Sequence, residues 1–229
     1  METRSYPARL DGRFDETTSR WMWLLKPVLV LPHIIVLVFL WVGVFFATFA
    51  AGVSILFTTR YPRGLFDFNV GVMRWSWRVA FYSFSAYGTD HYPPLTLQSD
   101  PLYPADFDVD YPQQLSRGLV LVKWWLLALP QLVIVAVFAG GFGLHFGNLV
   151  GLLALIAVVI YAFSGKYPRD MFDLIMGFNR WCYRVLAYVA LMRDEYPPFR
   201  LDVGGPDPGH MAEEPSAPAP QPVGAAPVG

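Results

Sequence analysis

Two pairs of arginines are the residues whose type and spacing best fit chemistry. Arg74 and Arg78 lie one helical turn apart, and Arg180 and Arg184 repeat that spacing later in the chain. Two guanidinium groups so placed repel each other, so each pair needs a shared anion. A lipid phosphate, which paired guanidinium groups can hold, would be a functional occupant. A carboxylate of the protein itself would make a structural ion pair instead.

Candidate carboxylates for the structural ion pair lie in two places. At 100° per residue, Asp67 and Asp173 fall on the same helical stripe as the arginines that follow them. Asp15 or Glu16 of the N-terminal segment could also fill this role. Gly71, beside the first pair, leaves room for a group to approach the helix surface. The ion pair is the simpler interpretation, and lipid phosphate is the functional alternative.

The arginines must be positioned by two amphipathic helices, which the spacing predicts over residues 65–87 and 171–192. Crossing a bilayer would cost such a helix about 2.5–3.5 kcal/mol for each charge near its centre. A helix lying in the inner membrane interface avoids this cost, with its aromatic side chains at the acyl boundary. The expected interfacial anchors are Trp75, Trp77, Tyr82, Trp181 and Tyr188.

Other residue types do not assemble into a reactive group. Cys182, the one cysteine, sits in an apolar helical context typical of a small core residue. His33 lies in an apolar helix, but its counterpart Gln131 cannot carry a proton, so a hydrogen-bonding role is favoured. The sequence contains no phosphate-binding glycine loop and no zinc motif. We therefore expect no catalytic residue, no metal and no cofactor, and a protein that is not an enzyme.

Composition places the chain in a membrane. Of 229 residues, 55% are apolar and only 15% are charged. The net charge of −1 gives no general attraction for nucleic acid, which is excluded as an expected partner. Membrane lipids are the expected partners, together with other membrane proteins or a second copy of the chain.

Two long uncharged stretches define the membrane segments. No Asp, Glu, Lys or Arg occurs from Pro27 to Thr59 or from Trp124 to Gly165. Each stretch is much longer than the roughly 20 residues that one crossing needs. The sequence therefore predicts two transmembrane hairpins, at 20–60 and 119–165. The first would turn near Val42 and Gly43, and the second in a glycine-rich loop at 140–147.

The cations indicate an orientation. All 17 Lys and Arg residues lie before, between or after the predicted hairpins, and the hairpin turns contain none. Because Lys and Arg favour the cytoplasmic flanks of membrane segments, we expect a multi-pass protein of the cell membrane with both termini in the cytoplasm.

The two hairpins belong to a duplicated unit. Tyr6-Pro7-Ala8, Ser19-Arg20 and Lys26 recur as Tyr103-Pro104-Ala105, Ser116-Arg117 and Lys123. After each hairpin a second pattern recurs: Tyr-Pro-Arg-x-x-Phe-Asp, then Gly-x-x-Arg-Trp-x-x-Arg-Val and Asp-x-Tyr-Pro-Pro. The repeats are residues 6–98 and 103–202. Two repeats that each cross the membrane an even number of times share one topology, so the axis relating them should follow the membrane normal.

This order of motifs resembles the domain-of-unknown-function family numbered 4389, in two tandem copies covering about Tyr6 to Asp202. The first copy departs from the pattern at Leu95, where the second has Phe199. The resemblance implies a membrane protein and brings no biochemical activity with it.

The expected fold class is an all-α membrane protein with four transmembrane helices in two hairpins, two interfacial helices and short cytoplasmic strands. Alternating apolar residues at 8–11, 95–98, 107–110 and 199–203 predict the strands, which could pair into a small sheet that ties the repeats together. The Pro- and Ala-rich segment 204–229 is expected to be disordered.

Three functions fit this fold. The first is a non-enzymatic scaffold or lipid-associated accessory protein with anionic-lipid contacts at the inner leaflet. The second is a transport or channel subunit with a path between the repeats, which the absence of acidic residues in the helices disfavours. The third is an enzyme acting on a lipid headgroup.

Overall fold

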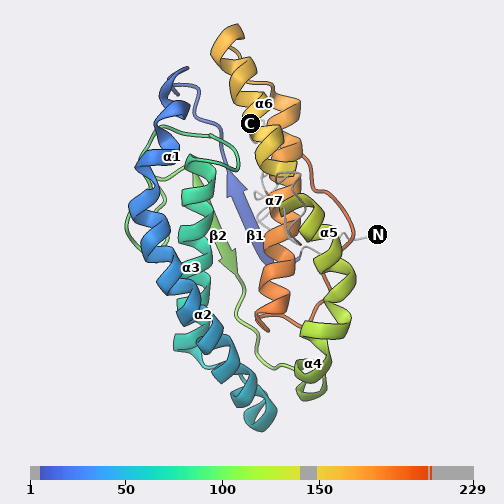
Figure 1. Ribbon diagram of the computed structural model, residues 1–229. Helices are drawn as coiled ribbons and strands as arrows, with labels where there is room; N and C mark the ends of the chain where they lie inside the picture. The colour runs from blue at the N-terminus through green and yellow to red at the C-terminus, as the bar shows by residue number, and fades with distance from the viewer. Residues whose placement is uncertain (1–5, 140–148, 206, 208–229) are drawn as a thin grey trace, which may run out of the picture.

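The computed structural model describes residues 6–139, 149–205 and 207 and is mostly helical with one small sheet (Figure 1). The elements in chain order are β1 (Ala8–Gly12), the 3-10 turn η1 (Met22–Leu24), α1 (Lys26–Leu29), α2 (Leu31–Thr58), α3 (Arg63–Tyr82), β2 (Ala105–Val109), α4 (Arg117–Val122), the π-helical turn η2 (Lys123–Leu127), α5 (Leu129–Ala139), α6 (Leu149–Ser164) and α7 (Arg169–Val189).

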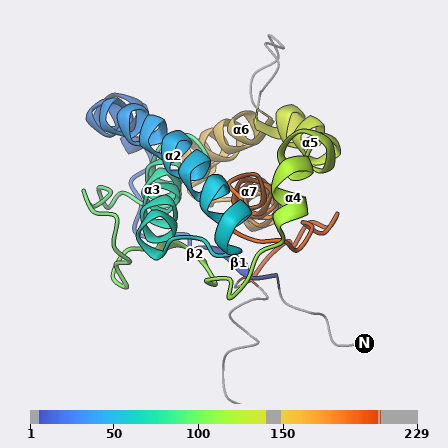
Figure 2. The same cartoon turned by 90° about the horizontal axis from the view of Figure 1, so that it is seen from below.

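These elements form three layers (Figure 2). The apolar helices α2, α5 and α6 make one outer layer. Helices α3 and α7 lie in the middle, and the sheet β1-β2 makes the opposite outer layer. The middle helices are therefore covered on both sides, and each contributes buried side chains to the core.

The first predicted hairpin is wrong. Helix α2 runs without a break through Val42 and Gly43, where the turn was expected. One glycine without a flanking proline or polar turn residue does not end a helix that is otherwise apolar. Gly43 instead allows close packing, because a β-carbon there would lie 3.1 Å from Cζ of Phe68 on α3.

Helix length identifies one candidate for a membrane crossing. Within residues 6–139, 149–205 and 207, one helix, α2, is long and apolar enough to cross a membrane. Helix α6 is apolar but shorter. The turn of the second predicted hairpin, at 140–147, lies outside the described residues.

Both predicted amphipathic helices form, as α3 and α7, and each begins directly after a proline, Pro62 or Pro168. The sheet is a single antiparallel pair in which Leu10 lies opposite Phe107. Its buried residues alternate with charged ones, so one face packs on the middle layer and the other presents carboxylates. Strand alternation of this kind is what the sequence pattern predicts at β1 and β2.

The repeats exchange their leading strands. β2, which opens the second repeat, packs on α3 of the first, and β1 packs on α7 of the second (Figure 1). The segments that follow the strands also cross over: the amide of Leu115 donates to the carbonyl of Thr59, and the hydroxyl of Tyr161 donates to the carbonyl of Thr18. Neither repeat is completed by its own residues.

Two of the four predicted strands are not strands. Residues 95–98 and 199–203 instead run as irregular chain against α3 and α7. A β-carbon on Gly71 would lie 2.8 Å from Cβ of Leu97, and one on Gly177 would lie 3.3 Å from Cγ2 of Val203. The room that Gly71 leaves is thus filled by the chain itself.

Candidate functional site

The arginines of α3 are held by the strand that the second repeat contributes. Arg74 donates to the carbonyls of Phe107 (2.8 Å) and Leu97 (3.1 Å) and pairs with Asp106 and Asp108 at 3.0 Å each. Its guanidinium is therefore surrounded by acceptors from two chain segments.

Arg78, one turn later, is fully buried. It donates to the carbonyls of Gln98 (2.9 Å) and Ala105 (3.4 Å) and pairs with Asp106 at 3.1 Å. Burial lowers the pKa of Arg78, while the charge of Asp106 acts in the opposite direction. Asp106 is thus the anion shared by both arginines of this helix.

The arginines of α7 are held in the same way. Arg180 donates to the carbonyl of Leu10 on β1 at 3.1 Å and lies 3.7 Å from Asp207. Arg184 pairs with Asp202 and, at 3.1 Å, with Asp207. Asp207 is fully buried, so ordered structure extends beyond residue 204, where a disordered tail was expected. The rest of that tail, 208–229, lies outside the described residues.

The carboxylates predicted to pair with the arginines lie elsewhere. Asp67 forms an exposed pair with Arg63 on its own helix, and Asp173 lines an open cleft near Gly205. Asp15 contacts His91, and Glu16 pairs with Arg169. The geometry therefore favours structural ion pairs over bound phosphate, with acceptors from β2 and the C-terminal segment rather than from the predicted positions.

The predicted interfacial anchors are buried in the core rather than exposed. Each indole has a partner inside the protein: Trp75 donates to His33 (3.0 Å), Trp77 to the carbonyl of Asp11 (2.8 Å), and Trp181 to Gln131 (2.7 Å). The reason is the layer order, because α3 and α7 are covered by apolar helices on one side and by the sheet on the other. The five residues concerned are Trp75, Trp77, Tyr82, Trp181 and Tyr188.

His33 and Gln131 occupy equivalent places in the two repeats. Each accepts a hydrogen bond from a buried indole, which agrees with the hydrogen-bonding role expected for His33. The side-chain amide of Gln131 also donates to the carbonyl of Pro197 at 2.9 Å. Nε2 of His33 has no hydrogen-bond partner within the described residues.

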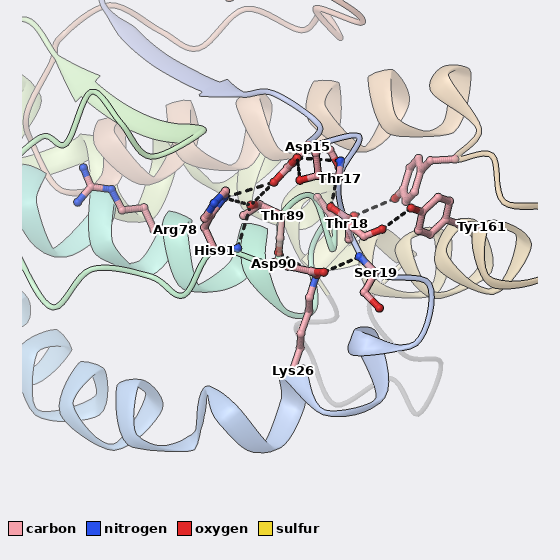
Figure 3. A network of polar contacts seen from close by, with 12 residues as sticks. Asp15, Thr17, Thr18, Ser19, Lys26, Arg78, Thr89, Asp90, His91 and Tyr161 are labelled. Atoms are coloured by element: carbon pink, nitrogen blue, oxygen red, sulfur yellow. Dashed lines mark hydrogen bonds and ion pairs between the residues drawn. The ribbon is translucent and has the colours of Figure 1, made fainter.

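A second duplicated polar cluster surrounds Lys26 (Figure 3). Its ammonium donates to the carbonyl of Thr89 at 2.8 Å, pairs with Asp90 at 2.9 Å, and lies 5.1 Å from the ring centroid of Tyr82. The amide of Ser19 donates to the same carboxylate. Burial lowers the pKa of Lys26, and the Asp90 charge counteracts this.

The second repeat builds the same cluster from the equivalent residues. Lys123 pairs with Asp194 at 2.7 Å, donates to the carbonyl of Arg193 and faces the ring of Tyr188, while Ser116 donates its amide to the carboxylate. The recurrence of Ser, Lys and Asp at matching places is the signal that could have revealed this cluster from sequence. The Asp-x-Tyr-Pro-Pro pattern is therefore a structural motif that fixes the turn before α2, or before α5, to its own repeat.

The third notable feature is the outer surface of α2. One stripe of the helix, including Leu37, Val44 and Ala51, is buried against the rest of the protein. The remaining surface is apolar and exposed, with its largest side chains at Phe39, Phe45, Phe46, Phe49 and Phe57. Helix α6 adds further exposed residues to the same layer, Leu152, Leu155, Ile156, Ile160 and Phe163. A continuous apolar face of this extent is typical of an interaction surface.

The buried arginine clusters hold the repeats together. In the part of the chain that the structure describes, no group of three or more His, Cys, Asp or Glu side chains could hold a metal ion. The buried arginines are engaged by carbonyls and carboxylates of the other repeat or of the C-terminal segment.

Comparison with known proteins returns one match. No curated protein and no solved structure matches the chain. The family described as Domain of unknown function (DUF4389) matches residues 20–96 and again 118–200. These ranges contain α2 with α3 and α5 with α6 and α7, so each match covers the helices of one repeat without its leading strand. The chain therefore belongs to the DUF4389 family and carries two tandem copies of its domain.

Proposed function

We propose that this protein is a non-enzymatic membrane component whose apolar layer is embedded in lipid and whose sheet layer forms a rigid platform in the cytoplasm. One observation carries the proposal: exposed apolar and charged side chains lie on opposite outer layers. Most of the large exposed apolar residues lie on α2, α5 and α6, while the half-exposed carboxylates Asp106, Asp108 and Asp110 belong to β2 or follow it.

Because carbonyls and carboxylates of the protein already engage the arginines of α3 and α7, we expect lipid headgroups to contact other cations. Arg20, Arg60 and Arg117 are exposed and flank the apolar helices, where anionic headgroups would lie. Cations at headgroup depth add attraction to an anionic leaflet. The interface between the repeats supports a scaffold rather than a transport path, because buried Tyr61 and half-buried Tyr167 each donate to a carbonyl of the opposite repeat.

Alkaline carbonate extraction tests the membrane location. We expect the protein to remain with the membrane fraction, because the surface of α2 has no polar face to stabilise it in water. Release into the supernatant would contradict the proposal.

The scaffold role is tested by purification in mild detergent followed by native mass spectrometry. We expect the chain in a fixed stoichiometry with a second polypeptide or a second copy of itself. A monomer in every mild detergent, carrying lipid alone, would remove the scaffold function while leaving the membrane location intact.

A further inference from the structure

We infer that the apolar layer lies in the plane of the membrane within one leaflet, so that α2 runs parallel to the bilayer surface and does not cross it. This inference rests on the membrane location proposed above and specifies which lipid surface the protein binds. The surface is the exposed face of α2, α5 and α6, and its occupant is the acyl region of a single leaflet.

The centre of α2 lies beside the centre of α3. Nε1 of Trp41 donates to Ser76 at 3.0 Å, and the amide of Asn69 donates to Thr48 at 3.1 Å. The middle of α2 therefore lies against the middle of α3. Any depth assigned to one central segment applies to the other.

Charged side chains lie beside the centre of α3, at the same depth as the centre of α2. Arg74 lies near the centre of α3 and pairs with Asp106 and Asp108, whose side chains are 33% and 47% exposed. If α2 crossed the bilayer, these carboxylates would face hydrocarbon at its midplane, where charged side chains are strongly disfavoured. The two-stranded sheet would also present open edges to lipid, which spanning structures do not do. With α2 in the plane, the sheet faces water.

The diameter of a helix fits the thickness of one leaflet. The hydrocarbon core is about 30 Å thick, so one leaflet provides about 15 Å. A helix with its side chains is about 10–12 Å across. One layer of helices therefore fits within a leaflet, with α3 and α7 at headgroup level and the sheet in water.

The symmetry between the two repeats also fits an in-plane helix. Helix α2 of the first repeat runs in the opposite direction to α5 and α6 of the second (Figure 1). Helices α3 and α7 also run in opposite directions, and the two strands are antiparallel (Figures 1 and 2). The axis relating the repeats therefore passes through the three layers. When this axis follows the membrane normal, both repeats meet the leaflet at the same depth.

The cations agree with this placement. Lys26 precedes α2, and at the other end Arg117 donates to the carbonyl of Phe57 at 3.0 Å. A crossing helix would carry these cations to opposite sides of the membrane, against the bias of Lys and Arg for one side. An in-plane helix keeps them at one surface.

Thiol accessibility tests the inference. Single cysteines are placed in a Cys182→Ala background at the two ends of the layer, Ser19→Cys and Gln113→Cys, and on the exposed centre of α2, Val42→Cys. Right-side-out and inside-out vesicles are treated with a membrane-impermeant maleimide. Leu102→Cys, at an exposed position three residues before β2, marks the platform side.

We expect Ser19→Cys, Gln113→Cys and Leu102→Cys to react from the same side and Val42→Cys to react from neither. Reaction of Ser19→Cys and Gln113→Cys from opposite sides would show that α2 crosses, and would overturn the in-plane placement while the membrane location stands. Reaction of Val42→Cys from the side opposite Leu102→Cys would also overturn it, because the centre of α2 would then reach the far surface of the membrane. Release of the protein by alkaline carbonate would instead remove the proposed membrane location itself.

Discussion

Replacing Arg78 with methionine should separate a structural arginine from one that holds lipid. Arg78 is fully buried and makes three hydrogen bonds, to the carbonyls of Gln98 and Ala105 and to Asp106. Methionine keeps the apolar stem but leaves these acceptors without their donor. Breaking a buried ion pair costs about 3–5 kcal/mol. Because Asp106 keeps its contact with Arg74, we expect the lower end, about 3 kcal/mol.

Unfolding in mild detergent, followed by tryptophan fluorescence, measures this loss as a fall in melting temperature of roughly 6–12 °C for a chain of this size. Arg63→Met is the matched control, since Arg63 lies on the same helix in an exposed pair with Asp67. Arg63 also lies over the ring of Tyr111, 4.6 Å from its centroid, so the control should lose about 1 kcal/mol, well below the loss expected for Arg78→Met. Equal stability of the two variants, with loss of bound anionic lipid in Arg78→Met alone, would refute the structural assignment.

Three further predictions follow from the buried contacts. His33→Gln should keep full stability, because the second repeat uses Gln131 at the equivalent place. His33→Leu should lose about 1–3 kcal/mol, because the Trp75 indole is left without an acceptor. Thermal unfolding of both variants measures the difference, and equal losses would contradict the prediction. Burial raises the pKa of Tyr61 to about 12. The unfolded chain therefore loses this proton near pH 10 while the folded chain keeps it, so Tyr61 alone should lower stability by about 2–3 kcal/mol between pH 10 and 12, and the decline in Tyr61→Phe should be smaller by that amount. An identical decline in Tyr61→Phe would argue against it. A chain split in the exposed turn before β2 should reassemble when both halves are coexpressed, because each strand completes the other repeat. Copurification of the two halves on a single tag measures reassembly. Two halves that fold separately and do not copurify would contradict the strand exchange.

The parts of this fold that local periodicity controls were predictable. The duplication, the helices α3 and α7, and the strands β1 and β2 follow from recurring motifs and from periods near 3.6 and 2 residues. Helix α2 was not, because the length of an uncharged run gives the amount of apolar chain and says nothing of where it bends. Gly43 was compatible with either a turn or a close helix contact, and packing against Phe68 decided the matter.

Local sequence patterns could not predict which carboxylates pair with the arginines of α3 and α7. The carboxylate of Asp106 comes from a strand of the other repeat, and that of Asp207 from a segment whose composition resembles a disordered tail. Tryptophan burial was ambiguous for a similar reason. An indole such as that of Trp77 suits a membrane interface and a protein core equally well, and the layers that cover α3 decide between them.

The depth of α2 along its length is the most direct measure of the in-plane placement. Phe39, Phe46 and Phe57 are 71%, 63% and 77% exposed, and their spacing puts them on one line along the helix at 3.6 residues per turn. Spin labels at these positions in lipid bilayers report depth through their accessibility to oxygen and to a water-soluble nickel chelate. An in-plane helix gives the same depth at all three positions. A crossing helix would separate Phe39 from Phe57 by about 27 Å, at about 1.5 Å per residue, and that gradient would contradict the account.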